Sequence, residues 1–254
     1  MKFYILLICL LTLPSWKLSA QEADYKVNFE KGLKAYQNKD YNLSVKFFEQ
    51  SLSTELKSAE AYNNLGLAYY NSADVGRAIL NFERALRIRP TYSAARKNLK
   101  AAEQYIDTKI KRNSGFWLFS GLFTLSMMMS SFAWSMIFFL LLFASAAAFL
   151  VWYLKLNDKL SFMGLRLGII FIVLAIFPLG FARSAAREQF DKNLAIVTAV
   201  RVGVRTAPGL DGEDIIVLSS GVKATIQEEM GDWYKIRLEN AVVGWIPAKT
   251  LEKI

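Results

Sequence analysis

Histidine is absent from this 254-residue chain, and Cys9 is its only cysteine. The sequence therefore lacks the commonest general base and the commonest zinc ligand. Cys9 lies in a segment that we expect to be removed, so no thiol nucleophile, internal disulfide or cysteine metal site is expected in the mature chain. No other constellation of catalytic residues is evident. The sequence predicts no enzyme activity, no catalytic residue, no metal site and no cofactor.

Residues 1–20 have the pattern of a secretory signal peptide. Lys2 precedes the apolar run Phe3–Leu13, and the segment ends in small residues at Leu18-Ser19-Ala20. This pattern predicts cleavage before Gln21 and export of the chain. The alternative, an uncleaved membrane anchor, is less favoured because the apolar run is short.

Charged residues are missing from residues 116–154. As one helix, this segment would be roughly 58 Å long, about twice the hydrocarbon thickness of a bilayer. The run must therefore be divided, and Ser130-Ser131 is its most polar point. We expect residues 116–129 to form an interfacial helix, because they are short for a span, and residues 132–154 to cross the membrane.

A short turn over residues 155–161 leads to a second predicted crossing, residues 162–182. Two crossings return the chain to its starting side. Because the signal peptide sets a translocated N-terminus early, we place both flanking regions in the periplasm and the turn in the cytoplasm, with the bacterial inner membrane as the location. The count of Lys and Arg on the two sides does not favour this orientation. In the alternative, residues 116–129 also span and the C-terminal region is cytoplasmic.

The formal net charge of +9 gathers beside the apolar segments, which suits anionic lipid headgroups rather than nucleic acid. Arg166, near the start of the second crossing, has two interpretations. An intramembrane charge can mark a transport path, but close to a helix end it more often extends to the interface.

A repeat precedes the apolar region. Gly32 and Gly66 stand 34 residues apart, and the side chains around them recur in register. The matched pairs are Tyr36 and Tyr70, Tyr41 and Val75, Ser44 and Ala78, Phe48 and Phe82, Ser51 and Ala85, and Leu52 and Leu86. With Pro90 closing the second copy, this period is typical of the tetratricopeptide repeat (TPR), a helix-turn-helix unit that forms docking surfaces.

We place the repeats at residues 25–58 and 59–92. A capping helix follows them, and the whole domain covers residues 25–112. Lys100 stands in the capping helix where each repeat has its glycine. Close packing of a further helix is therefore not required there. Two repeats and a cap are at the lower limit for independent stability, so support from the membrane or a partner is expected.

The concave face, built from the first helix of each repeat and the cap, is the predicted docking groove. Its candidate residues are Phe29, Leu33, Tyr36, Gln37, Asn63, Asn64, Leu67, Tyr70, Asn71, Lys97 and Asn98. Aromatic and amide groups suit an extended peptide or a partner helix, although each residue could instead pack within the repeat. TPR proteins that grip chaperone C-termini use a lysine and an asparagine in the first repeat. Phe29 and Leu33 occupy those columns, which argues against such a clamp.

From residue 195 the pattern changes to alternation with turn residues. The predicted strands are Ala195–Val200, Ile215–Leu218, Val222–Gln227, Trp233–Leu238 and Val242–Pro247. Five short strands in this length predict a small all-β barrel over residues 195–254. The acidic residues Asp211, Glu213 and Asp214 fall in one hairpin, where a solvated turn is expected rather than a metal loop.

The last region resembles the bacterial SH3-like domain, through Val204-Arg205-Thr206-Ala207-Pro208, Gly231-Asp232-Trp233-Tyr234-Lys235-Ile236 and Gly244-Trp245-Ile246. The order of signal peptide, repeats, paired membrane helices and SH3-like domain resembles the BatE-type proteins of the bacterial aerotolerance operon. That resemblance implies von Willebrand A-domain Bat proteins and a MoxR-type ATPase as partners, and no catalytic activity.

Trp233, Tyr234 and Trp245 could line an SH3 groove for a proline-rich peptide. In a small barrel such residues more often form core and rim.

The fold class expected is a multidomain membrane protein with an all-α TPR solenoid, a transmembrane helical hairpin and an SH3-like barrel. Its expected function is a non-catalytic membrane-anchored scaffold that docks proteins through the TPR groove. The alternative is a cell-wall sensor that binds peptidoglycan or peptide through the SH3-like domain.

Overall fold

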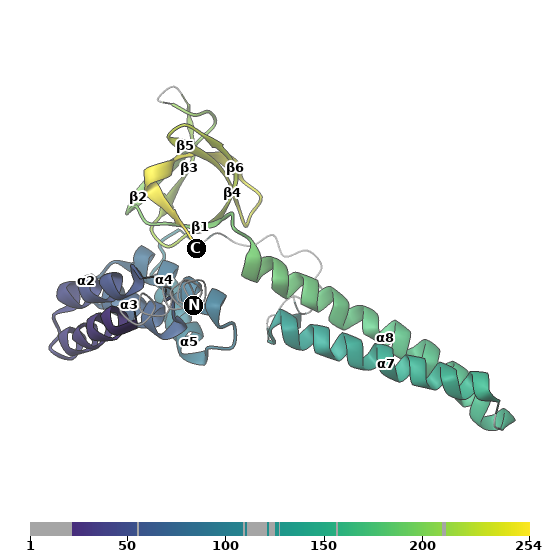
Figure 1. Ribbon diagram of the computed structural model, residues 1–254. Coiled ribbons are helices and arrows are strands. Elements are labelled where there is room, and N and C mark those ends of the chain that lie inside the picture. The colour runs from purple at the N-terminus through teal and green to yellow at the C-terminus, as the bar shows by residue number, and fades with distance from the viewer. Residues whose placement is uncertain are drawn as a thin grey trace, which may run out of the picture. The chain divides into compact units, whose positions relative to one another are not determined.

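The computed structural model describes residues 22–54, 56–108, 110, 121, 125–126, 128–155, 157–209 and 212–254. The predicted signal peptide and most of the predicted interfacial helix, residues 116–129, lie outside these residues. The chain divides into two compact units, one of residues 1–113 with 192–254 and one of residues 114–191 (Figure 1).

The first unit begins with a helix over residues 22–37. It continues with α2 (Tyr41–Leu52), α3 (Ala59–Asn71), α4 (Val75–Ile88) and α5 (Ser93–Glu103). Asp40, Ser58 and Asp74 cap α2, α3 and α4, each accepting a hydrogen bond from a backbone N–H in the first turn. Lys39 and Ala73, equivalent positions of the two repeats, both turn with positive φ, 62° and 66°. The two repeats thus share the same local geometry.

Small residues let these helices approach closely. A Cβ placed at Gly32 would lie 2.8 Å from the Phe48 ring, and one at Gly66 would lie 2.6 Å from Phe82 Cε1. The other small residues of the repeat, Ser44, Ser51, Ala78 and Ala85, are fully buried. The helical TPR region predicted from the 34-residue period is therefore present.

The C-terminal part is an antiparallel sheet with strand order β3-β2-β6-β5-β4-β1-β7. Its strands are β1 (Leu194–Val197), β2 (Arg201–Arg205), β3 (Asp214–Ser219), β4 (Lys223–Met230), β5 (Trp233–Leu238), β6 (Val243–Pro247) and β7 (Leu251–Lys253). The structure has seven strands where the sequence predicted five, because β2 and β7 were missed. Alternate residues of these strands fill one core, which includes Val204, Leu218, Ile236 and Ile246.

The sheet and the repeats share buried side chains within the first unit. Ile196 of β1 is fully buried and belongs to the cluster of apolar residues that fills the repeats. Gly221 has a φ of +93°, and a Cβ there would lie 2.7 Å from Ile79 Cδ1 of α4. Thr108 and Ser219 exchange two hydrogen bonds of 3.0 Å. The two modules are therefore packed together rather than joined only by chain.

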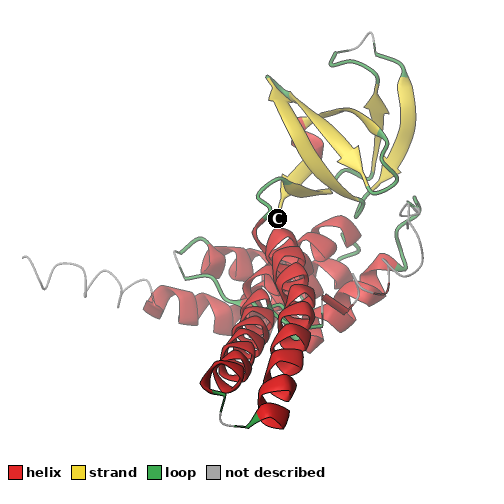
Figure 2. Cartoon of the chain, turned by 90° about the vertical axis from the view of Figure 1, so that its right-hand side faces the viewer, coloured by secondary structure: helices red, strands yellow, loops and turns green. Residues whose placement is uncertain are grey.

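The second unit is a helical hairpin of α7 (Ser131–Leu154) and α8 (Asp158–Phe190), seen running side by side in Figure 2. Small residues line the contact. A Cβ at Gly164 would lie 2.6 Å from the Ala148 carbonyl oxygen, and buried Ser145 donates a 2.9 Å hydrogen bond to the Gly168 carbonyl. The second helix is longer at both ends than the predicted residues 162–182, because charged and small residues at its ends continue the helix.

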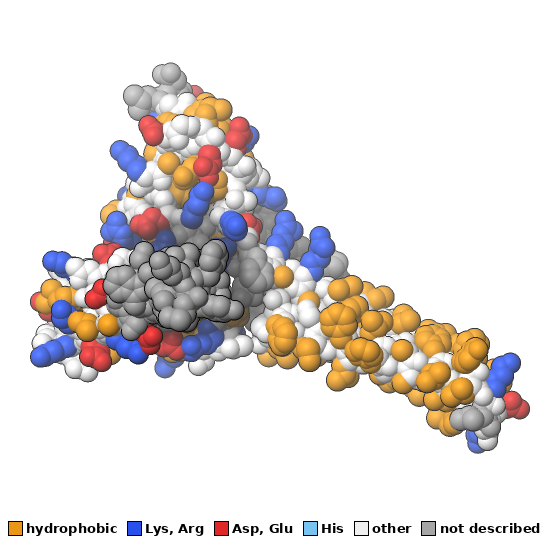
Figure 3. Space-filling model, in the orientation of Figure 1, with side chains coloured by type: hydrophobic (Ala, Val, Ile, Leu, Met, Phe, Trp, Pro, Cys, Tyr) orange, Lys and Arg blue, Asp and Glu red, His pale blue; other side chains and the backbone are white. Residues whose placement is uncertain are grey.

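Both hairpin helices are long and apolar enough to cross a membrane by length and composition, with a mean hydropathy of 2.4. Their apolar side chains face outward, as Figure 3 shows. Phe132 and Phe143 are each 74% exposed, and Ile176 is 64% exposed. Exposing this many apolar side chains along both helices to water is unfavourable.

Candidate protein-docking surface

Two hydrogen bonds join successive first helices along the concave face. Asn98 Nδ2 donates to Asn63 Oδ1 at 2.9 Å, and Asn71 Nδ2 donates to Tyr36 Oη at 3.0 Å. Each pair joins residues 35 positions apart, one more than the repeat. Asn63 is buried, with 4% of its surface exposed. These four predicted groove residues therefore hold the repeats in register, which limits what they can offer a ligand.

Three predicted apolar residues of the face are half-buried and pack onto the repeat core. Phe29 lies 5.6 Å from the Phe48 ring, while Leu33 and Leu67 contact the same buried cluster. These residues support the groove and expose only part of their surface to a partner.

The accessible part of the concave face lies between α3 and α5. The rings of Tyr70 and Tyr105 meet edge to face with 5.8 Å between centroids, and Tyr105 is 63% exposed. Donating a hydrogen bond to Tyr105 raises the pKa of Tyr70 above its ordinary value. Within the described residues, the side chains of Asn64 and Lys97 make no hydrogen bond or ion pair. The structure thus places an exposed tyrosine, Tyr105, against the half-buried Tyr70.

Tyr105 was missed by the sequence analysis. It falls in the column of Gln37 and Asn71 rather than that of Tyr36 and Tyr70, so the repeat pattern gave it no aromatic counterpart. Gln37 itself is exposed at the end of the first helix.

The three aromatic residues of the predicted SH3 groove do not share one face of the sheet. Trp233 and Trp245 lie on the same side, since Lys235 pairs with Trp245 and stands two residues from Trp233. Tyr234 points the other way and packs on the sheet core. Cations cover the indoles: the Arg205 guanidinium lies 5.7 Å from the Trp233 ring, and Lys235 Nζ lies 5.7 Å from the Trp245 ring.

The described acidic residues of the β2–β3 hairpin do not gather into a site. Asp211 lies outside the described residues, and Asp214 pairs with Arg205 at 3.3 Å. Across the part of the chain that the structure describes, no group of three or more Asp, Glu, His or Cys side chains is placed to hold a metal ion.

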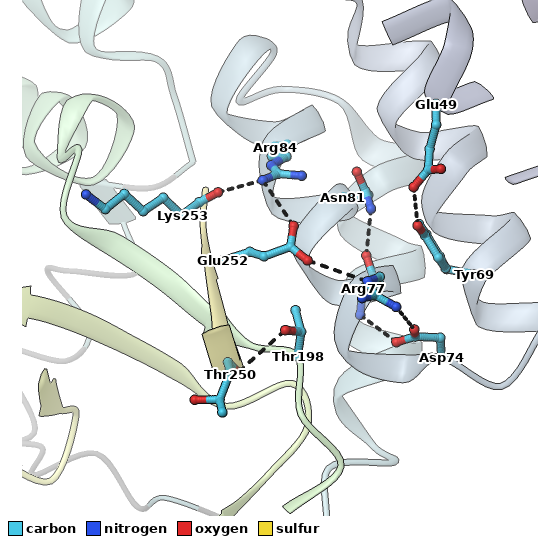
Figure 4. A network of polar contacts seen from close by, with 10 residues as sticks. All are labelled: Glu49, Tyr69, Asp74, Arg77, Asn81, Arg84, Thr198, Thr250, Glu252 and Lys253. Carbon is cyan, nitrogen blue, oxygen red and sulfur yellow. Dashed lines mark hydrogen bonds and ion pairs between the residues drawn. The ribbon is translucent and has the colours of Figure 1, made fainter. Parts of the chain in front are cut away.

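A polar network between α4 and β7 was also missed (Figure 4). The Glu252 carboxylate lies 3.5 Å from Arg77 Nε and 3.7 Å from Arg84 Nη2. Arg84 donates a 2.7 Å hydrogen bond to the Lys253 carbonyl, and Arg87 donates a 2.6 Å bond to the Ile254 carbonyl. No sequence signal links these residues, because they are more than 160 positions apart.

Comparisons with known proteins identify the two modules. Residues 59–92 match the tetratricopeptide repeat family, and residues 200–252 match the bacterial SH3 domain family. TPR and SH3 domains are typically non-catalytic interaction modules, so the chain combines two protein-interaction folds.

One curated relative is photosystem I assembly protein Ycf3 of Prochlorococcus marinus (strain NATL2A). It is 27% identical over 85 residues, which are 32% of this chain and 49% of that protein. The match therefore spans about half the length of the relative. Among solved structures, the TPR domain of Arabidopsis OM64 is 23% identical, with a TM-score of 0.32, over 33% of this chain and 69% of that chain.

Proposed function

We propose that this protein is a non-catalytic scaffold, anchored in a membrane by α7 and α8, that docks partner proteins through its concave TPR face. The observation that carries the proposal is the difference between the two faces of the repeats. On the concave face Tyr105 and Lys97 are exposed and Asn64 is half-buried. Part of the surface of the second helix α4 is instead covered by the chain's own sheet.

The character of the concave face supports a protein partner. Aromatic rings and amides bind extended or helical peptides, and tyrosine provides contact area with few rotatable bonds. Ycf3, a relative of the repeat region, is named as an assembly protein. We carry over only the general role of assisting assembly.

Membrane anchoring is supported by the outward-facing apolar side chains of α7 and α8. A helix of 24 residues is about 36 Å long, enough to cross about 30 Å of hydrocarbon. Lys155 and Lys159 flank one end of the hairpin, and Arg183 and Arg187 lie near the other. Such cations favour the headgroup regions. Arg166, exposed and two turns into α8, is proposed to extend toward the same interface.

The packing of the sheet against the repeats favours two crossings. Two modules that share a buried core must lie on the same side of the membrane, which requires an even number of spans between them. A third span in residues 116–129 would separate them. Because the pattern of residues 1–20 favours export, we propose an inner-membrane protein with both modules in the periplasm.

The order of modules further suggests a place in a Bat/MoxR-type envelope complex. The expected partners are membrane-anchored von Willebrand A-domain proteins and a MoxR-type ATPase, which this proposal carries over from the resemblance in module order.

Co-purification tests the docking role. The full-length protein in detergent is the bait, and the von Willebrand A-domain proteins are quantified among the captured partners. We expect Asn64→Ala combined with Tyr70→Ala to reduce capture by more than about tenfold, since aromatic anchors carry much of an interface's energy. Asn42→Ala with Gln50→Ala, exposed on α2, is the matched control. Equal capture by both double variants, with unchanged thermal melts, would move the docking role away from the concave face.

A second function is favoured by the indole face of the sheet. Trp233 with Arg205 and Lys235 beside it combines an aromatic surface with cations, which suits a ligand bearing sugars and carboxylates, such as a peptidoglycan fragment. Retention of the protein on immobilised muropeptides should then fall with Trp233→Ala and persist in the Asn64→Ala, Tyr70→Ala variant. Retention unchanged by Trp233→Ala would exclude this role for the indole face.

A further inference from the structure

One face of α4 carries two arginines with an amide between them. Arg77, Asn81 and Arg84 are spaced by four and three residues, so their side chains lie on the same side of the helix. Figure 4 shows Asn81 beside Arg77 and Arg84, with Glu252 between the two guanidinium groups. This face belongs to a second helix and is therefore distinct from the concave face.

Asn81 is almost fully buried, with 2% of its surface exposed. Its Nδ2 donates a 2.8 Å hydrogen bond to the Arg77 carbonyl of the preceding turn. Its Oδ1 has no hydrogen-bond partner among the described residues. An unpaired buried carbonyl oxygen is costly, on the order of 1–3 kcal/mol, so this oxygen calls for a donor that the structure does not supply.

Two adjoining clefts open on this face. One of about 310 Å³ includes Asn81, Tyr69 and Glu252 in its lining, and one of about 430 Å³ includes Lys57, Arg87 and Lys253. Leu52, Tyr62 and Arg84 line both clefts, so the two are continuous.

The cleft offers positive charge at Lys57, Arg77 and Arg84. Two further cations of its lining are already engaged: Lys253 forms a 2.5 Å ion pair with Glu229, and Arg87 donates to the Ile254 main-chain oxygen. Asp74 lies 3.0 Å from Arg77, and of the two carboxylates in the lining, Glu49 is held by the Tyr69 hydroxyl and Glu252 lies between the arginines. An acidic ligand would therefore meet Lys57 and the two arginines around Glu252.

Glu252 occupies the space between the arginines loosely. Its distances of 3.5 and 3.7 Å exceed the 2.7–2.9 Å or so of a well-formed charge-assisted hydrogen bond, and its side chain is 41% exposed. A carboxylate held in this way can be replaced by one with better geometry at little cost.

We propose that this cleft binds an acidic segment of a partner protein, in which one Asp or Glu carboxylate displaces Glu252 and bridges Arg77 and Arg84. In the bound state Asn81 Oδ1, which lines the same cleft, accepts a backbone N–H of the segment. Tyr62 and Leu52 contact its neighbouring side chains. The site is separate from the concave groove. It is formed by the repeats and the sheet together, because β7 forms one of its walls.

Fluorescence anisotropy of the full-length protein in detergent tests the proposal. The probe is a labelled, capped peptide of alternating glutamate and alanine. We expect Arg77→Ala and Arg84→Ala each to weaken binding on the order of tenfold, the effect of losing a charge-assisted contact. Asn81→Leu, which keeps the volume without the carbonyl, should also weaken it. Glu252→Ala and Glu252→Gln should tighten binding, because the competing carboxylate is gone.

The controls separate a built site from general charge attraction. Arg89→Ala removes the same charge outside both clefts, where Arg89 pairs with Glu60, and should leave binding unchanged. The matching peptide of glutamine and alanine should not bind. An equal loss with Arg89→Ala, no gain with either Glu252 variant, or displacement of the peptide by phosphatidylglycerol vesicles or by inorganic phosphate would each overturn the proposal. Thermal melts of every variant verify that the two modules stay folded.

Discussion

Single small residues set how closely the helices of the repeats approach. Gly66 lies against the Phe82 ring, and Gly32 lies in the same way against Phe48. In both repeats the absence of a side chain leaves room for the aromatic ring of the second helix. The energetic consequence is that this position tolerates no larger side chain without displacing a fully buried ring.

Gly66→Leu should therefore destabilise the protein. Inserting four carbons against a buried phenylalanine typically costs about 1–3 kcal/mol. The loss is measurable as a lower midpoint in urea unfolding followed by circular dichroism. Ala101→Leu, at an exposed position of α5, adds similar volume and should have little effect. Equal midpoints for Gly66→Leu and the parent would mean that the close contact is absent in solution.

Glu103 illustrates how a single charge couples stability to pH. Partial burial and the nearby Glu83 raise the pKa of Glu103 above its ordinary value of about 4.5. The folded state then binds this proton more tightly than the unfolded state. The stabilising contribution is complete below that ordinary value and is lost as the pH rises through the higher folded pKa.

Glu103→Gln should accordingly give a small rise in melting temperature at neutral pH and no change well below pH 4.5. Glu60→Gln should have the opposite effect and lower the melting temperature at neutral pH. A backbone N–H and Arg89 lower the pKa of Glu60, so its contribution is present at neutral pH and is lost on acidification. Melting curves at several pH values follow both variants. A fall at neutral pH for Glu103→Gln would contradict the assignment.

At the scale of elements, the contact between α7 and α8 depends on close approach of their backbones. Gly164 faces the Ala148 carbonyl and Gly168 faces the Phe149 ring, whereas a Cβ placed at Gly180 of the same helix would meet no described atom within 4 Å. Without a hydrophobic driving force in lipid, packing at small residues stabilises helix association. The two classes of glycine should therefore respond differently to substitution.

Gly164→Leu should separate the hairpin helices, while Gly180→Leu should be tolerated. Disulfide cross-linking between cysteines placed at Ala148 and Leu165 in a Cys9→Ala background measures the contact in native membranes. We expect cross-linking to fall several-fold with Gly164→Leu only. A similar fall in both variants would show that leucine disturbs the helix itself rather than the packing.

The elements that the sequence predicted well are those with a local signal. The 34-residue period located the second repeat, which the family match covers at residues 59–92. The two strands that were not predicted gave weaker signals. Strand β7 has only three residues, and β2 directly follows the predicted strand at residues 195–200, so that its own alternation of side chains did not stand out. The charged ends of α8 concealed its true length, since an apolar run marks only the uncharged part of the helix rather than the whole helix.

The candidate sites were less predictable because they depend on contacts across the chain. Repeat columns placed Asn63, Asn98, Tyr36 and Asn71 on the concave face but could not show that they bind one another. The Arg77–Glu252 pair spans 175 positions and follows from the docking of the sheet on α4, which no local pattern encodes.

At the scale of the whole molecule, one of the two compact units is built from two distant stretches of chain. Residues 1–113 and 192–254 form that unit, and residues 114–191 are inserted between them. Two repeats with one extra helix expose apolar residues at their ends. Ile196 and the β1 strand cover part of that surface, so the sheet supplies the support that the short repeat array needs.

This arrangement predicts that both modules are reached from one side of the membrane. Single cysteines at Asn42 on α2, Asp232 in the β4–β5 turn and Lys159 at the hairpin end are exposed positions for an impermeant thiol reagent in a Cys9→Ala background. In intact spheroplasts we expect labelling at Asn42→Cys and Asp232→Cys, and at Lys159→Cys only after permeabilisation. The physical reason is that a shared core around Ile196 cannot form across a bilayer, so the inserted segment must cross an even number of times. Opposite labelling of the two modules would require an odd number of crossings and would rule out their packing in the membrane-bound protein.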